Sequence, residues 1–420
     1  MPYPSEMGSD NIADMTTPGI AVALLLLALP ASAQTRAFTG LRLFDGTGRP
    51  TIADATILVR DGRIVAVGPA ASITVPSGAE RVSLAGKFAI PGLINAHGHV
   101  NSNYDLNVYA AYGTTTVFSL GDVPDEVFAA RDQQASPKLS RTRVFIASPA
   151  LAVFDSDSAT LAVVAAMRKK IDLVKIRVDD NLGTTRKSPP EAFSRAISVA
   201  HDHKLPIAAH LYYFEDAKRL VEANVDVLAH SIRDVEIDEA FAERVREARI
   251  CYIPTLMREV STYVYESTPA FFADPLFIAH ANKDWVAQLS RPERQAEFRN
   301  STSGQKYRAQ LPIAKRNLRK LADAGALIAM GTDTGPFGRF QGYFELLELE
   351  QMTDAGLTPR QAIVAATRDA ARCMKVERDL GTLEAGKWAD FVVLDADPFA
   401  DINNVRKINS VYIAGNRVAR

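Results

Sequence analysis

Between residues 89 and 376, short apolar runs alternate with longer stretches in which apolar residues recur every three or four positions. Short apolar runs bounded by turn residues are typical of buried strands, and the three-to-four spacing is typical of helices, as at residues 190–201 and 214–223. Strands that alternate with helices form parallel sheets, so this region predicts an α/β fold, a (β/α)8 TIM barrel. Its eight expected strands are residues 90–97, 114–120, 143–148, 173–178, 207–211, 227–231, 250–255 and 327–332.

The two ends of the chain show a different pattern, with short alternating segments separated by turns. Residues 55–67 contain the turn Asp61-Gly62 between two such segments, and residues 386–418 have the same character. Neither end has enough strands to enclose a core alone. We therefore expect both ends to form one small composite β-sandwich, from residues 34–88 and 377–420, which leaves residues 89–376 for the barrel.

One connection within the expected barrel is unusually long. Residues 257–317 follow the seventh strand and are rich in aromatic and charged side chains, among them Tyr263, Trp285 and Tyr307. Connections of this length in compact domains usually cover or shape a site. The alternative is a set of extra helices packed on the rim of the barrel.

An apolar run near the N-terminus predicts a signal peptide. Residues 20–30 are too few to span a bilayer, and Ala31-Ser-Ala33 follows them as a cleavage site of small residues. We expect residues 1–33 to be removed, and the mature protein to be secreted or periplasmic with no membrane association. The residues before the run lack Lys and Arg, which is atypical, but initiation at Met15 would remove the acids found there. An uncleaved membrane anchor is the alternative.

Charge and cysteine content argue against some classes of protein for this chain. The 420 residues carry 48 basic and 49 acidic side chains without a long run of one sign, so a nucleic-acid partner is not expected. A small-molecule substrate is expected instead, and a homo-oligomer is possible. Cys251 and Cys373 are too few for a disulfide framework and lack the spacing of a zinc knuckle, so two unpaired thiols are expected.

Candidate metal ligands stand at the ends of the expected strands. His97 and His99 end the first strand, and side chains two apart in a strand share a face, so both can bind one ion. His210 and His230 end the fifth and sixth strands, and Asp333 follows the eighth. Because barrels place their sites at the C-terminal ends of strands, we expect these side chains to converge on metal.

An aspartate and a lysine add chemistry to these histidines. Asp333 can bind metal and serve first as general base and then as general acid. Lys175 interrupts the apolar strand at residues 171–176, where an ammonium group facing a divalent metal would be repelled. Either Lys175 points outward, or carbon dioxide has converted it to a carboxylated lysine, an anion able to bridge two metal ions.

Three motifs together resemble the amidohydrolase superfamily, and within it the imidazolonepropionase-like and Xaa-Pro dipeptidase-like enzymes. They are Pro91-Gly-Leu-Ile-Asn-Ala-His-Gly-His99, Gly331-Thr-Asp333 and residues 381–391. The resemblance covers most of the mature chain and implies two divalent metal ions, with zinc expected. It places His97, His99 and Asp333 at one ion, His210 and His230 at the second, and carboxylated Lys175 between them. It also suggests that Tyr212 hydrogen-bonds the developing oxyanion.

These observations predict a metal-dependent hydrolase that cleaves amide bonds of dipeptides or N-acyl amino acids through a metal-bridging hydroxide. Arg177 and Arg233 are candidates to bind a substrate carboxylate, since a guanidinium group binds it bidentately, although each could form a structural ion pair instead. Three alternatives stay open. They are a mononuclear hydrolase of cyclic amides related to imidazolonepropionase, in which Lys175 is not a ligand, a lactonase or phosphotriesterase, and a non-catalytic periplasmic metal-binding barrel.

Overall fold

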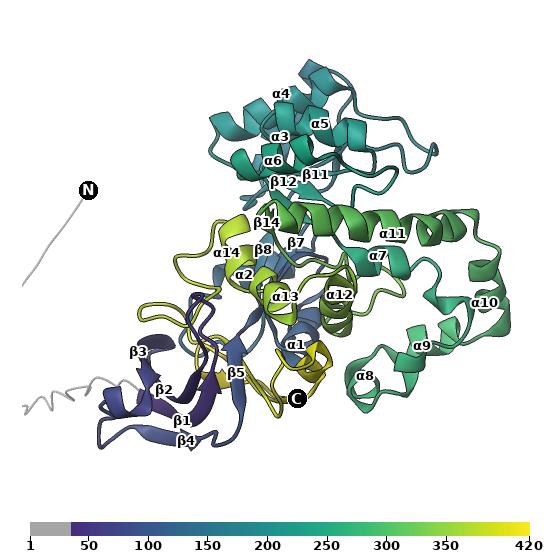
Figure 1. Ribbon diagram of the computed structural model, residues 1–420. Helices are drawn as coiled ribbons and strands as arrows, with labels where there is room; N and C mark the ends of the chain where they lie inside the picture. Colours follow the sequence, from purple (N-terminus) through teal and green to yellow (C-terminus); the bar gives the residue numbers. More distant parts are fainter. Residues whose placement is uncertain (1–34) are drawn as a thin grey trace, which may run out of the picture. The chain divides into compact units, whose positions relative to one another are not determined.

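A computed structural model describes residues 35–420 (Figure 1). The predicted signal peptide, residues 1–33, lies outside the described residues. Among the helices of residues 35–420, none combines the length and the apolar character that crossing a membrane requires.

Both ends of the chain contribute strands to one sheet. Hydrogen bonds join its eight strands in the order β17-β16-β15-β5-β1-β2-β3, with β4 paired to β1. The two ends meet where β5 and β15 pair antiparallel, with Phe88 opposite Leu394. The Phe38 ring packs at 5.0 Å from Phe391 and at 4.8 Å from Tyr412, so the core of this sheet is also shared by both ends. The strands are β1 (Thr35–Leu43), β2 (Ile52–Arg60), β3 (Arg63–Pro69), β4 (Glu80–Ser83), β5 (Phe88–Pro91), β15 (Phe391–Leu394), β16 (Ile408–Ile413) and β17 (Asn416–Arg417).

This end sheet is a single hydrogen-bonded unit, and its division into a sandwich stays a prediction. The first strand expected for the barrel, residues 90–97, is in fact two strands that belong to different sheets. The chain changes sheets at Gly92, where a Cβ atom would lie 2.1 Å from the Thr115 hydroxyl oxygen. Position 92 therefore has no room for a side chain, and glycine is required there.

The middle of the chain forms two parallel sheets, which confirms the α/β fold. One has the order β6-β7-β8 and the other the order β14-β13-β12-β11-β10-β9. Single bridges connect them, between Gly98 and Thr334 on one side and between Ala147 and Leu173 on the other. The strands are β6 (Leu93–Gly98), β7 (Thr114–Ser119), β8 (Arg143–Ile146), β9 (Leu151–Ala152), β10 (Val174–Arg177), β11 (Ile207–His210), β12 (Val227–Ala229), β13 (Cys251–Ile253) and β14 (Leu327–Ile328).

Helices follow most of these strands and bury their apolar faces. In α5 (Phe214–Glu222), for example, Ala217, Leu220 and Val221 are buried at the spacing expected of an amphipathic helix. Both helices predicted from the sequence, at residues 190–201 and 214–223, are present. They are α4 (Pro190–Asp202) and α5, and the further helices that accompany these strands are α1 (Asn103–Ala111), α2 (Asp125–Asp132), α3 (Ser156–Met167), α6 (Glu239–Glu247), α12 (Tyr343–Asp354), α13 (Pro359–Ala365) and α14 (Arg368–Cys373).

The long insertion is helical, as its second interpretation expected. Its 22-residue helix α11 (Thr302–Asp323) packs against α7 and α6, which brings the insertion back onto the parallel sheet. In Figure 1, α8, α9 and α10 extend from α7 and return through α11. The elements are α7 (Leu256–Val260), η2 (Val264–Glu266), η3 (Ala270–Ala273), α8 (Pro275–His280), α9 (Lys283–Leu289), α10 (Pro292–Arg299) and α11.

The two cysteines form a disulfide, so the prediction of unpaired thiols was wrong. Cys251 begins β13 and Cys373 ends α14, and their Cα atoms lie 5.5 Å apart. The two residues are separated by 122 positions in sequence, and no local pattern indicates that β13 and α14 meet.

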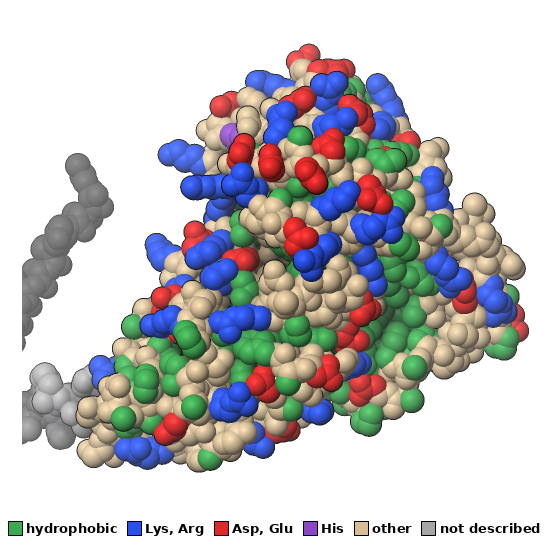
Figure 2. Space-filling view, in the orientation of Figure 1, with side chains coloured by type: hydrophobic (Ala, Val, Ile, Leu, Met, Phe, Trp, Pro, Cys, Tyr) green, Lys and Arg blue, Asp and Glu red, His purple; other side chains and the backbone are tan. Residues whose placement is uncertain are grey.

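Charged side chains of both signs lie on the face of the molecule shown in Figure 2. Figure 2 shows basic and acidic groups interspersed across the visible face. This agrees with the formal net charge of −1.

Candidate functional site

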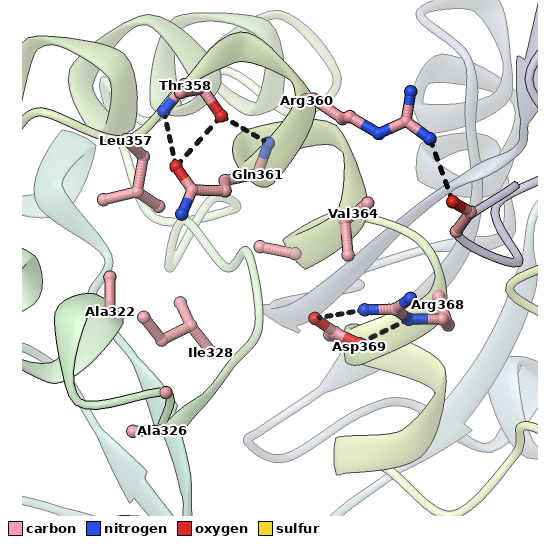
Figure 3. Close-up of a pocket in the computed structure, with 13 residues that line it drawn as sticks. Ala322, Ala326, Ile328, Leu357, Thr358, Arg360, Gln361, Val364, Arg368 and Asp369 are labelled. Atoms are coloured by element: carbon pink, nitrogen blue, oxygen red, sulfur yellow. Dashed lines mark hydrogen bonds and ion pairs between the residues drawn. The ribbon is translucent and has the colours of Figure 1, made fainter. Parts of the chain in front are cut away.

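A cavity of about 360 Å³ lies between α11, α13 and α14 and contains none of the predicted site residues (Figure 3). Its charged groups already have partners. Arg368 pairs with Asp369 at 2.8 Å, and Arg360 donates to the backbone oxygen of Arg49 at 2.8 Å. The candidate site therefore lies elsewhere, at the predicted metal ligands.

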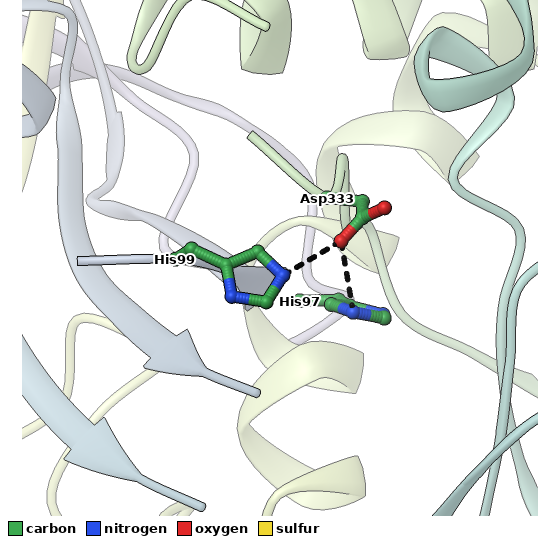
Figure 4. A group of neighbouring side chains, drawn as sticks. All are labelled: His97, His99 and Asp333. Atoms are coloured by element: carbon green, nitrogen blue, oxygen red, sulfur yellow. Dashed lines mark hydrogen bonds and ion pairs between the residues drawn. The ribbon is translucent and has the colours of Figure 1, made fainter. Parts of the chain in front are cut away.

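His97, His99 and Asp333 form a compact group at the ends of β6 and of the segment after β14 (Figure 4). Asp333 Oδ1 lies 2.8 Å from His99 Nε2 and 3.3 Å from His97 Nε2. The backbone N–H groups of Thr332 and Asp333 both donate to the His97 carbonyl, which fixes the two segments side by side. The ligand atoms of the three side chains all lie within 4.8 Å of one another, so they can hold one ion.

A buried glutamate on α12 supports this group. One carboxylate oxygen of Glu345 accepts from Asn95 Nδ2 at 2.6 Å and from the Thr332 and Thr334 hydroxyls at 2.7 Å each. These donors flank His97 and Asp333 in sequence, so Glu345 fixes the backbone on both sides of the group. Sequence reasoning missed this residue, although Glu345 and Glu348 stand three residues apart on an otherwise apolar helical face.

The remaining predicted ligands converge on the same place. The His230 ring lies 4.1 Å from that of His210 and 4.5 Å from that of His97. His230 Nδ1 is 2.9 Å from the Thr255 hydroxyl, and His210 Nε2 is 3.2 Å from Asp179 Oδ2. Such second partners orient a metal-binding imidazole.

Lys175 points into the site and not outward. Its side chain is buried, and it interacts electrostatically with Asp333 and with the buried histidines. Lys175 Nζ and His230 Nε2 are both buried without a hydrogen-bond partner among residues 35–420. Unpaired buried nitrogens of this kind are costly unless a further group completes them, so they fit a site built for metal.

Burial sets the protonation states of these groups. It lowers the pKa of Lys175 to about 7 and that of His210 to about 4, and it holds the pKa values of His97 and His230 well below their ordinary value. Burial alone would raise the pKa of Asp333, but Arg339 and the two histidines outweigh it and hold this pKa well below its usual range. Neutral imidazoles beside an ionised carboxylate form a donor set suited to a divalent metal.

The residues predicted to contact substrate already have partners within the protein. Arg177 Nε pairs with Asp179 Oδ1 at 3.1 Å, and the fully buried Arg233 lies with its Nε 3.2 Å from Glu259 Oε1. Both arginines therefore make ion pairs, the alternative considered for each. The Tyr212 hydroxyl donates to Gln310 Oε1 at 2.5 Å, so an oxyanion would have to replace this acceptor.

Three charged residues beside the site were not identified from the sequence. Asp333 Oδ2 accepts a hydrogen bond from Arg339 and lies 3.8 Å from Arg258 Nε, and Glu259 pairs with Arg258 at 3.1 Å. Arg258 and Glu259 come shortly after β13, at the strand end where barrels place site residues. Their position directly after an expected strand could have identified them from the sequence as candidate site residues.

Comparisons with known proteins agree with the geometry. The model of the amidohydrolase family matches residues 88–418. Among curated relatives, imidazolonepropionase of Rubrobacter xylanophilus is 28% identical over 89% of this chain and 92% of its own, and that of Deinococcus radiodurans is 25% identical over 87% and 92%.

Solved structures share the fold. A putative prolidase from Bifidobacterium longum superposes with a TM-score of 0.74 at 24% identity, covering 92% of this chain and 95% of its own. A Xaa-Pro dipeptidase with bound methionine gives 0.73 at 20% identity, covering 91% and 99%.

Proposed function

We propose that this chain, which belongs to the amidohydrolase family and is a hydrolase acting on carbon–nitrogen bonds, cleaves the amide bonds of dipeptides or N-acyl amino acids. The observation that carries the proposal is the convergence of His97, His99, His210, His230 and Asp333 around buried Lys175. Family membership implies a divalent metal ion, and His97, His99 and Asp333 can hold it. We further propose a second ion at His210 and His230, zinc as the metal, and carboxylation of Lys175 between the two.

We infer that the two parallel sheets close into the (β/α)8 barrel expected from the sequence. The bridges from Gly98 to Thr334 and from Ala147 to Leu173 support this closure. In such a barrel the candidate ligands occupy the C-terminal ends of the strands, which form the catalytic face.

Asp333 is the residue proposed to move the proton. When bound, the metal ions would polarise the amide carbonyl and lower the pKa of the attacking water. Arg339 keeps the Asp333 carboxylate ionised, so it accepts a proton as the water oxygen bonds to the carbonyl carbon. Asp333 then returns that proton to the leaving nitrogen as the carbon–nitrogen bond breaks. Tyr212 remains the candidate to stabilise the oxyanion, in exchange for its bond to Gln310.

A second candidate function follows from the curated relatives, which are imidazolonepropionases. In that case the chain would open a cyclic amide with one metal ion, and Lys175 would not be a ligand. Metal analysis of Lys175→Ala separates the two. Loss of one ion and of activity supports the two-metal amidase, whereas an active variant with one zinc ion per chain supports the cyclic-amide hydrolase.

We also propose that the protein acts outside the cytoplasm, in the periplasm or secreted. The disulfide between Cys251 and Cys373 supports this, because disulfides persist in oxidising compartments. Mass spectrometry of the exported protein should find an N-terminus at Gln34. A protein that begins at Met1 or Met15 would contradict signal cleavage.

The test of the proposed function is release of free amine from a panel of dipeptides, Xaa-Pro peptides and N-acyl amino acids. The protein is loaded with zinc in the presence of bicarbonate, and a chelator-treated sample is the control. Turnover that the chelator abolishes supports the proposal. If no member of this panel releases amine but cyclic amides or lactones are cleaved, the proposed function is wrong.

A further inference from the structure

Two buried arginines share a single carboxylate beside the metal ligands. Arg233 Nε lies 3.2 Å from Glu259 Oε1, and Arg258 Nη1 lies 3.1 Å from Glu259 Oε2. Arg233 and Glu259 are fully buried, and the Arg258 side chain is 9% exposed. The Glu259 carboxylate therefore pairs with two guanidinium groups in a place that water hardly reaches. We call Arg233, Arg258, Glu259 and Tyr307 the α7 wall.

The guanidinium groups of the α7 wall have donors to spare. Arg258 Nε and Arg233 Nη2 are buried and make no hydrogen bond within residues 35–420, and Arg233 Nε has only its ion-pair contact with Glu259. Buried polar groups in native proteins are almost always satisfied, and the exceptions often indicate a ligand site. These unused donors are therefore the feature that the protein alone does not explain.

The α7 wall is adjacent to the reacting groups. Arg258 Nε lies 3.8 Å from Asp333 Oδ2, and Arg258 also acts electrostatically on Lys175 and His210. The Tyr307 ring of α11 lies 4.8 Å from the Arg258 guanidinium and 5.3 Å from that of Arg233. Stacking on an aromatic face leaves the N–H edge of a guanidinium group free for an anion.

We propose that Arg258, with Arg233 behind it, binds a carboxylate of the substrate while the scissile amide lies at the metal ligands. This inference rests on the proposed function and narrows it to anionic substrates, such as dipeptides with a free C-terminus and N-acyl amino acids. Neutral lactones and phosphotriesters lack the group that the α7 wall recognises. Planar guanidinium donors bind a carboxylate more specifically than a lysine does, because two parallel N–H bonds can form.

The first arm of the test is kinetic and uses matched substrates. N-Acetylleucine and its C-terminal primary amide share one scissile bond, and acetate release reports its cleavage in both. We expect Arg258→Met to lower kcat/KM about 100-fold more for N-acetylleucine than for its amide, since the loss on the amide reports only the effect of the missing charge on Asp333. Arg258→Lys should restore part of the difference. Equal losses on both substrates, or no loss on either, would overturn the inference.

Arg308→Met is the matched control on the insertion. Like Arg258, Arg308 is an arginine of the insertion, but it lies on α11, is half-exposed and pairs with Glu266 at 2.6 Å. The Arg308→Met variant should have the same kcat/KM as the wild type for both substrates. Melting temperature and metal content are measured for each variant, and Arg233→Met provides a second disruption of the α7 wall if Arg258→Met fails to fold.

The second arm is independent of turnover. Binding of L-leucine and L-leucinol, which lack an amide bond, is measured by calorimetry on the metal-loaded protein. The wild type should prefer leucine at least tenfold, and Arg258→Met should lose this preference. If the wild type prefers leucine over leucinol but hydrolyses no amide, the anion site is supported and the proposed function is rejected. A preference that survives Arg258→Met would reject the anion site alone.

Discussion

On one side of the site, Asn95, Thr332 and Thr334 all donate to one carboxylate oxygen of Glu345, and we call these four residues the β6 wall. On the α7 wall, by contrast, three guanidinium nitrogen atoms have no hydrogen-bond partner. Both walls are buried, so burial alone does not explain the difference. Donors that share one internal acceptor hold a fixed geometry, whereas unused donors are available to a molecule that enters and leaves.

Asp333→Asn should have the largest effect, because Asp333 lies between Thr332 and Thr334 of the β6 wall and is the residue proposed to move the proton. Asparagine keeps the shape but cannot accept a proton, and we expect kcat to fall about 100- to 10,000-fold. Thermal unfolding should stay close to that of the wild type. A variant that retains wild-type kcat would refute the assigned role.

Glu345→Gln tests whether the β6 wall depends on its single acceptor. Glutamine presents an NH2 group as well as an oxygen to three donors, so Asn95 and the two threonines lose a common partner. We expect a 10- to 100-fold loss of metal affinity or activity. Glu350→Gln, on the same helix but paired with Arg406 at 2.7 Å, is the control. If Glu345→Gln and Glu350→Gln have the same metal affinity and activity, the metal ligands do not depend on the β6 wall.

Glu348 connects the two walls, since its carboxylate accepts from the backbone N–H groups of Leu256 and Met257 at the start of α7. Burial raises the pKa of Glu348 from 4.5 to about 8. Between these values the folded state holds a proton that the unfolded state has lost, so stability should fall as pH rises. The expected slope is at most about 1.4 kcal/mol per pH unit.

Glu348→Gln should remove this slope. Chemical denaturation of the wild type and the variant at several pH values from 4.5 to 8 provides the measurement. Parallel curves for the two proteins would show that Glu348 is ionised in the folded state.

Arg177→Met should have the smallest effect. Arg177 pairs with Asp179 in a partly exposed position, and such pairs contribute about 0.2 to 1 kcal/mol. We expect KM for anionic substrates to change less than threefold. A tenfold rise in KM would show that Arg177, and not the α7 wall, receives the carboxylate.

The grouping of His97, His99 and Asp333 could be predicted from the sequence because each stands at the end of an apolar run within a local motif. The position of His97, His99 and Asp333 follows from strand periodicity and the geometry of parallel sheets alone. The direction of Lys175 did not follow from the sequence, because a strand lysine can point to either face.

The α7 wall could not be predicted, because it depends on contacts between segments distant in sequence. Arg258 follows β13, whereas Tyr307 reaches it from α11 at the far end of the insertion. The change of sheet at Gly92 was hidden for another reason, since the apolar run continues through it without a polar residue. The disulfide was missed because nothing local indicates that β13 and α14 are neighbours.

The pairing of β5 with β15 has a consequence for biosynthesis. Phe88 faces Leu394, so nearly the whole chain must leave the ribosome before β5 gains this neighbour. Until then β5 has an open edge, which in a nascent chain can pair with other molecules. Contacts this distant in sequence also form slowly. The end sheet is therefore the last part of the molecule expected to assemble, and the interval before it closes is when the chain depends most on chaperones.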